Sequence, residues 1–228
     1  MAALADSAIH LWFMNLADAC GDGSKDDCLS GEERERAARF GSEKARKGYV
    51  ATRSRLRRLL GAYLDSDPLA FEFAVNPHGK PRLKACGEDR GLVFNISHSG
   101  DFAVLGFAQD TALGVDIEAP RQHRNLEGLA AACLAPAELE RWRGLAPERC
   151  LEEFTRFWVC KEAFVKAVGR GLALGLAKVG VSPGFRGYDA LPAAYGPAAQ
   201  WRLQEWAYGE CRVAVAYRGG ERGISVFE

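Results

Sequence analysis

The sequence DFAVLGFA at residues 101–108 has a counterpart in ECRVAVAY at residues 210–217. Both octapeptides are predicted as strands, and a long helical pattern precedes each of them, at residues 44–64 and 152–168 respectively. The two copies lie about 110 residues apart, which indicates an internal duplication. The strands pair locally and do not alternate regularly with helices, so we expect an α+β fold of two similar halves rather than a parallel sheet.

Hydrophobic periodicity and turn residues predict the other elements. Strands are expected at residues 8–14, 71–75, 92–96, 201–206 and 211–217, and further helices after Ser30 and near residues 126–134 and 137–142. Residues 102–108 and 112–117 are expected to form a hairpin around Gln109-Asp110, and residues 21–25 a polar loop. The helix at 152–168 should end at Gly169, because glycine readily takes the left-handed backbone of a helix end.

Composition excludes several classes of protein. Thirty Lys and Arg balance thirty Asp and Glu among 228 residues, and 48% of residues are hydrophobic, which is unlike a disordered or collagenous chain. The sequence shows no secretory signal and no run of about eighteen apolar residues, so we expect a cytoplasmic protein without a membrane contact. Seven scattered cysteines without a C-x-x-C pair fit reduced thiols and argue against zinc. Locally, residues 44–58 carry seven basic side chains and no acidic one.

Two acidic residues in the segment 114–118 are candidates for a metal site. On a strand, Asp116 and Glu118 fall on one face while Val115 and Ile117 point into the core. Two carboxylates this close repel each other unless a cation lies between them, and oxygen ligands without His or Cys favour Mg²⁺. The alternative is a solvated polar face at the end of a strand.

The helix at 152–168 carries a second candidate. Trp158, Glu162 and Lys166 lie at positions i, i+4 and i+8, and therefore on one stripe of the helix. Glu162 could supply a third carboxylate to the metal, and Lys166 could contact a phosphate one turn away. The alternative is a surface ion pair worth about 0.2–0.5 kcal/mol.

Two polar turns complete the set. In residues 94–100 a strand is expected to run into a turn, where Ser97, His98 and the backbone amides could bind an anion. The turn at 79–82 presents Lys80 and Arg82. Both turns also have a non-functional explanation. His98 could be a plain surface residue, and Lys80 and Arg82 could simply belong to an ordinary hairpin turn.

Taken together, these motifs resemble those of the 4′-phosphopantetheinyl transferases, in particular the longer, two-half type that activates carrier proteins. The matching segments are Gly79-Lys80-Pro81, Asn95-Ile96-Ser97-His98-Ser99-Gly100, Gly114-Val115-Asp116-Ile117-Glu118, Trp158-x-x-Lys161-Glu162-Ala163-x-x-Lys166 and Gly169-x-Gly171-Leu172. The resemblance implies a pseudo-dimer with coenzyme A in the cleft between the halves. The expected halves are residues 1–112, with the nucleotide contacts, and residues 113–228, with the metal-binding and catalytic motifs.

The resemblance also implies a reaction and its residues. Such an enzyme moves the 4′-phosphopantetheine arm of coenzyme A to a serine of an apo acyl or peptidyl carrier protein and releases adenosine 3′,5′-bisphosphate. Asp116, Glu118 and Glu162 would hold Mg²⁺, Lys166 would meet the pyrophosphate, and Glu162 would be the base, directly or through a metal-bound water. The residues expected at the coenzyme phosphates are Arg53, Lys80 and His98, and those expected to line the nucleotide pocket are His78, Gly79, Lys80, Pro81, Arg82, Leu83, Asn95, Ile96, Ser97 and His98.

Two other functions fit part of the sequence. A Mg²⁺-dependent nuclease would use Asp116 and Glu118 for the metal and the basic segment 44–58 for a phosphate backbone, although Pro120 stands where a common nuclease pattern has lysine. A non-enzymatic RNA-binding protein would use the basic segment alone and would leave the acidic residues unexplained. We favour the transferase, expect it to act as a monomer without nucleic acid, and leave open whether it serves fatty-acid, polyketide, peptide or lysine metabolism.

Overall fold

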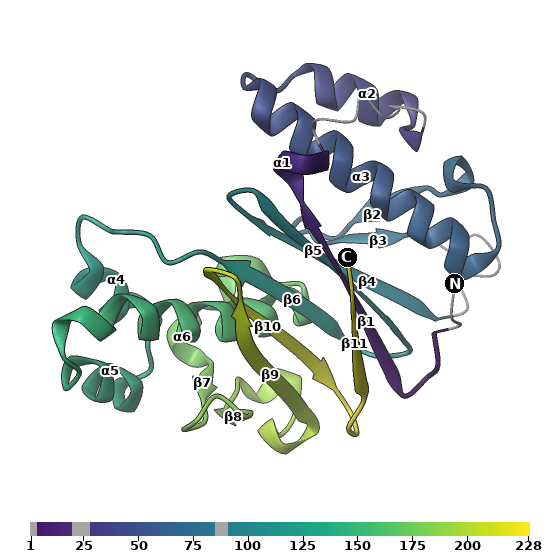
Figure 1. Cartoon of the computed structure of the whole chain (residues 1–228). Helices are drawn as coiled ribbons and strands as arrows, with labels where there is room; N and C mark the ends of the chain where they lie inside the picture. The colour runs from purple at the N-terminus through teal and green to yellow at the C-terminus, as the bar shows by residue number, and fades with distance from the viewer. Residues whose placement is uncertain (1–3, 20–27, 85–90) are drawn as a thin grey trace.

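The computed structural model describes residues 4–19, 28–84 and 91–228. The polar loop predicted at residues 21–25 lies outside the described residues. Two separate sheets form the centre of the molecule, and each has one 22-residue helix against it (Figure 1).

The first sheet has the strand order β11-β1-β5-β4. Its strands are β1 (Ala8–Asn15), β4 (Leu92–Ser99), β5 (Phe102–Gln109) and β11 (Gly223–Phe227). β5 pairs antiparallel with β1 and β4, whereas β11 pairs parallel with β1. Helix α3 (Glu43–Leu64) covers one face, because its buried residues Leu56 and Leu60 share an apolar cluster with Phe94 and Phe107.

The second sheet has the order β6-β10-β9 and is antiparallel throughout. Its strands are β6 (Leu113–Glu118), β9 (Trp201–Tyr208) and β10 (Cys211–Arg218). Helix α6 (Pro147–Val168) covers one face, where Phe164 packs with Trp201, Leu203 and Ala214. As predicted, α6 ends at Gly169, whose φ of 67° lies in the left-handed region.

Shorter elements complete the chain. They are α1 (Leu16–Ala19), α2 (Gly31–Ala38), β2 (Phe73–Val75), β3 (Pro81–Leu83), α4 (Leu126–Cys133), α5 (Pro136–Arg143), β7 (Gly180–Val181) and β8 (Tyr188–Ala190). Helix α2 begins directly after Ser30, as predicted, because the Ser30 hydroxyl and the Glu33 carboxylate each accept a hydrogen bond from the other residue's backbone N–H group. In the part of the chain described here, no helix combines the length and apolar composition needed to cross a bilayer.

The two halves repeat one topology. The first half runs through β1, α3, the β2–β3 pair, β4 and β5, and the second runs through β6, α6, the β7–β8 pair, β9 and β10. The corresponding strands also occupy corresponding places, because the order β1-β5-β4 matches β6-β10-β9. The predicted α+β fold with two similar halves is confirmed.

The inner faces of the two sheets pack against each other. Ile9, Leu11 and Val104 of the first sheet form one buried cluster with Val115 and Val213 of the second. The helices therefore lie on the outer faces, and Figure 1 shows α3 and α6 on opposite sides of the sheets. This order, helix, sheet, sheet and helix, makes the two halves one packed unit.

Two predictions about strands are wrong, and the short strands β3, β7, β8 and β11 were not predicted. Residues 102–108 and 112–117 form no hairpin, because β5 pairs with β1 and β4 while β6 pairs with β10 in the other sheet. The strand predicted at 92–96 continues to Ser99, where its polar side chains bond to the neighbouring sheet. β11 was not predicted, because its short, mostly exposed sequence has little apolar periodicity.

Candidate active site

Helix α6 crosses strand β6 at a glycine. A Cβ atom on Gly114 would lie 2.0 Å from the carbonyl oxygen of Ala163 and 2.4 Å from the amide nitrogen of Ala167. These distances are shorter than any ordinary contact, so only glycine lets the two backbones approach this closely. The close crossing brings side chains of α6 next to the carboxylates of β6.

Three carboxylates and one ammonium group meet at this crossing. Asp116 is only 2% exposed, and Glu118 and Glu162 are half-buried. The Nζ atom of Lys166 lies 2.6 Å from Oδ1 of Asp116. These four residues line a pocket of about 340 Å³ together with Ile96, Ser97, His98, Trp158 and Leu172. The structure thus assembles in one place the acidic and basic residues that the sequence places 50 positions apart.

The cluster has more buried negative charge than its one lysine compensates. Burial, and then the charge of Asp116, raises the pKa of Glu162 to about 7. Burial likewise raises the pKa of Glu118. Among the described residues, Oδ2 of Asp116 and Oε1 of Glu162 are buried without any hydrogen-bond partner. Because buried carboxylate oxygens without partners are costly, the arrangement is suited to a further cation.

Three side chains of β4 form hydrogen bonds with the free edge of β6, the edge on which β6 has no neighbouring strand in its own sheet. Asn95, Ser97 and Ser99 accept hydrogen bonds from the backbone N–H groups of residues 115, 117 and 119, at 2.8, 3.4 and 3.2 Å. These bonds satisfy N–H groups that an uncovered strand edge would leave unpaired. The side chains thereby join the two sheets beside the carboxylate cluster.

The serine hydroxyls also reach the carboxylates. Ser97 donates to Oδ1 of Asp116 and Ser99 donates to Oε2 of Glu118, each at 2.7 Å. Lys166 donates to Oγ of Ser97 at 2.6 Å. The prediction of an anion-binding turn at these positions is wrong in its local structure, because residues 97–99 belong to β4. His98, on the other side of the strand, is exposed and lines the same pocket.

Lys80 and the turn that carries it hold the C-terminal end of α6. The Nζ atom of Lys80 donates to the carbonyl oxygens of Leu113 and Ala167, at 3.0 and 2.9 Å. The side chain of Asn76 donates to the carbonyl oxygen of Gly169 at 2.6 Å. The carbonyl groups of Ala167 and Gly169 are among those that the end of a helix leaves free, and Lys80 and Asn76 satisfy them. Burial lowers the pKa of Lys80 to about 8.

The other predicted nucleotide contacts are distributed over the first half. Arg53 donates to Oε1 of Glu33 at 2.5 Å and lies 3.9 Å from the ring centroid of Phe73. His78, Gly79 and Arg82 are exposed, Pro81 is half-buried, and Leu83 is in the apolar cluster under α3. None of these residues lines the carboxylate pocket.

Nearby carboxylates neutralise much of the positive charge of the basic segment at residues 44–58. The ion pairs are Lys44–Asp101, Arg46–Glu43, Lys47–Glu43, Arg53–Glu33 and Arg57–Glu33. Cations already paired within the chain are less available to a nucleic-acid backbone, whose binding depends on neutralising phosphates. The pairing therefore disfavours both nucleic-acid alternatives.

A buried ion pair under the site was not predicted from the sequence. Lys161 is fully buried, and its Nζ atom lies 2.6 Å from Oε2 of Glu138. Glu138 also accepts the backbone N–H groups of Ala135 and Val181, each at 2.6 Å. The sequence does contain a signal for this pair. The spacing of Phe157, Lys161 and Phe164 places a lysine on the apolar face of the helix, where a lysine needs an acidic partner. This pair ties α5 to α6.

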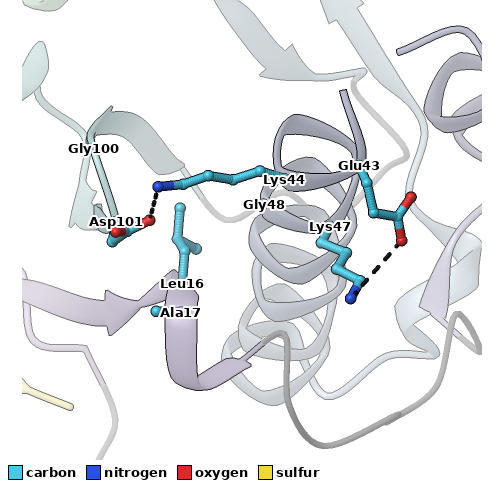
Figure 2. A pocket seen from close by; sticks show the side chains of 8 residues that line it. All are labelled: Leu16, Ala17, Glu43, Lys44, Lys47, Gly48, Gly100 and Asp101. Atoms are coloured by element: carbon cyan, nitrogen blue, oxygen red, sulfur yellow. Dashed lines mark ion pairs between the residues drawn. The ribbon is translucent and has the colours of Figure 1, made fainter. Parts of the chain in front are cut away.

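A second pocket, of about 380 Å³, lies between α1, α3 and the turn from β4 to β5 (Figure 2). Figure 2 shows its two lysines pointing to carboxylates of the same lining, Lys44 to Asp101 at 2.7 Å and Lys47 to Glu43 at 3.8 Å. The charges of this lining cancel in pairs. We therefore assign the chemistry to the smaller pocket at the crossing of α6 and β6.

Both halves of the chain match families of known proteins. Residues 112–216 match the 4′-phosphopantetheinyl transferase superfamily, and residues 24–110 match the family described as 4′-phosphopantetheinyl transferase, N-terminal. The 4′-phosphopantetheinyl transferase HetI of Nostoc sp. is 34% identical over 221 residues, which cover 95% of this chain and 90% of that protein. The protein slr0495 of Synechocystis sp. is 33% identical over 175 residues, which cover 77% of this chain and 70% of that protein.

A solved structure shows a weaker likeness. The holo-[acyl-carrier-protein] synthase of Thermotoga maritima is similar with a TM-score of 0.39 and 19% sequence identity, over 49% of this chain and 64% of that chain. The family assignment rests on the sequence matches, which cover both halves and include a relative that aligns with 95% of the chain. The chain therefore belongs to the 4′-phosphopantetheinyl transferases, the family that its motifs resemble.

Proposed function

We propose that this enzyme transfers the 4′-phosphopantetheine arm of coenzyme A to a serine hydroxyl of an apo carrier protein and releases adenosine 3′,5′-bisphosphate, with Mg²⁺ as the metal. Family membership supports the transfer. The observation that carries the proposal for this chain is the cluster of three carboxylates and Lys166 in one pocket.

The donor set of the cluster fits Mg²⁺. Asp116, Glu118 and Glu162 offer only oxygen ligands, and two of their buried oxygens have no partner. In the described residues no group of three acidic, His or Cys side chains lies close enough to hold a metal as it stands, so the fit is one of ligand type, and the three carboxylates would have to close around the ion. The Lys166 ammonium, 2.6 Å from Oδ1 of Asp116, takes up part of the negative charge. Bound there, Mg²⁺ would neutralise charge on the pyrophosphate of coenzyme A.

Two side chains of α6 would move and stabilise charge during the transfer. The carrier serine oxygen forms a bond to the β-phosphorus, the bond from this phosphorus to the bridging oxygen breaks, and the bisphosphate leaves with the electron pair. We assign Glu162 as the group that accepts the proton of the serine hydroxyl, because its carboxylate lines the pocket beside Asp116 and Lys166. Lys166, one helical turn away, stabilises the charge that grows on the leaving group.

The coenzyme's nucleotide would lie on the first half. His98 is the best-supported contact, because it is exposed and lines the pocket of the carboxylates. Lys80 and Arg53 remain proposals as phosphate contacts, and each would add a phosphate oxygen to the partners it already has. The exposed His78, Gly79 and Arg82 are proposed for the rim of the nucleotide site.

The decisive test uses an apo carrier protein, coenzyme A and Mg²⁺, with the carrier weighed by mass spectrometry. We expect a mass gain of one phosphopantetheine group. Asp116→Asn and Glu162→Gln keep the shape of the side chain and remove its charge, so each should lower the rate by about 10²–10³. The matched control is Glu148→Gln, an exposed carboxylate on the same helix, which should keep the wild-type rate. A carrier of unchanged mass across a panel of apo carriers would refute the proposal.

A further inference from the structure

The side chains along the edge of β6 follow a regular pattern. Asn95, Ser97 and Ser99 bond to β6 in register, each to the N–H group twenty positions later in the chain. The residues just before these N–H groups are Gly114, Asp116 and Glu118. Each serine, but not the asparagine, therefore has a carboxylate within reach.

The hydrogen bonds of each serine fix the position of one carboxylate oxygen. The Oγ atom of Ser99 accepts the N–H group of Ala119 at 3.2 Å, which leaves its proton free to bond to Oε2 of Glu118 at 2.7 Å. Ser97 repeats this arrangement with Ile117 N–H and Oδ1 of Asp116. The backbone of β6 thereby sets the place of the hydroxyl, and the hydroxyl sets the place of the carboxylate.

We infer that Ser97 and Ser99 are positioning residues that each fix one oxygen of the Asp116 and Glu118 carboxylates and so restrict where these carboxylates lie when the metal binds. The inference rests on the proposed function, in which these carboxylates bind Mg²⁺. Glu118 needs this support most, because a glutamate side chain has several rotatable bonds and loses more rotamer freedom than an aspartate when it is fixed. Ser99 is the cleaner test, because Ser97 also accepts a bond from Lys166.

Substitutions at Ser99 separate positioning from structural support. Ser99→Ala removes the donor to Glu118 and the acceptor for Ala119 N–H, whereas Ser99→Thr keeps a hydroxyl. Outer partners of metal ligands typically change metal affinity by about 10–100-fold when removed. Asn95→Ala is the matched control, because it removes the bond to Val115 N–H at a position where residue 114 has no carboxylate.

The test measures binding of Mn²⁺ alone to the metal-free full chain by electron paramagnetic resonance, alongside thermal unfolding. We expect Ser99→Ala to raise the Kd for Mn²⁺ by about tenfold, and Ser99→Thr to restore it. Asn95→Ala should lower the unfolding temperature and leave this Kd unchanged. In activity assays, Ser99→Ala should raise the Mg²⁺ concentration for half-maximal rate more than it lowers the rate at saturating Mg²⁺.

The outcomes distinguish this inference from the proposed function. If Ser99→Ala binds Mn²⁺ as tightly as wild type while Glu118→Gln binds it weakly, the positioning role is refuted and the metal site stands. If Asn95→Ala weakens Mn²⁺ binding as much as Ser99→Ala does, Ser99 affects the metal only by helping to hold the two sheets together. The inference is then also refuted. If the wild-type chain binds no Mn²⁺, the proposed metal site and the inference fall together.

Discussion

Gly114→Ala tests the close crossing of α6 and β6 on which the proposed site depends. The substitution adds a single methyl group to a buried strand. Its carbon would lie 2.0 Å from the carbonyl oxygen of Ala163 and 2.9 Å from Cα of Ala167. Both neighbours are backbone atoms of α6, so no side-chain rotation can relieve the contact.

The geometry gives the size of the effect. Restoring an ordinary contact of 3.4 Å would move α6 by roughly 1.4 Å away from β6. Overpacking a core costs typically 1–3 kcal/mol, and replacing glycine by alanine in a strand returns about 0.5–1 kcal/mol. A net loss of about 1–2 kcal/mol corresponds to a fall in Tm of about 2–8 °C for a chain of this length.

The same shift would separate the charged groups of the site. The distance of 2.6 Å between Nζ of Lys166 and Oδ1 of Asp116 would exceed a hydrogen bond. A displacement of about 1 Å in a reacting group can lower a rate about 100-fold. We therefore expect Gly114→Ala to lose far more activity than its modest loss of stability explains.

The assay compares Tm by calorimetry and the carrier-loading rate at a temperature where both proteins are folded. The matched control is Gly48→Ala, the same chemical change on α3, where the new carbon would lie 3.5 Å from Cδ1 of Leu16. This control should gain up to about 1 kcal/mol from helix propensity and keep the wild-type rate. If Gly114→Ala had wild-type Tm and rate, the close crossing and the argument built on it would be wrong.

Two further predictions concern buried cations. Lys161→Ala would leave the Glu138 carboxylate without the cation 2.6 Å away, so urea denaturation should show a loss of about 3–5 kcal/mol. Arg143→Ala, which breaks the exposed pair with Glu127, should cost less than about 1 kcal/mol, and equal losses would contradict the argument. Burial lowers the pKa of Lys80 to about 8 from the usual 10.5, so between these values the unfolded chain binds more protons at this site than the folded chain does. The stability of wild type relative to Lys80→Met should therefore rise from pH 8 to pH 10 in denaturant titrations, and a falling difference would show that burial does not disfavour the charged form.

Much of the fold could be predicted from the sequence, because its signals are local. The duplication is visible in two helix and strand patterns, and α3 and α6 end close to the predicted positions. The alternation of residues 114–118 predicts Val115 in the core and Asp116 on the other face, and the structure places Val115 among buried residues of both sheets. The period of a strand or helix depends only on neighbouring residues, so one sequence suffices to read it.

Contacts between distant segments were decided only by the tertiary structure. β5 and β6 follow each other along the chain with a short connection, which is typical of a hairpin, and nothing in their sequences says that they lie in different sheets. The proximity of Ser99 and Glu118, and of Lys80 and the end of α6, likewise depends on how the two halves pack. Residue type and spacing determine which groups are available for chemistry. The partner of each group depends on long-range packing, which here places two serines beside two carboxylates and a lysine at a helix end.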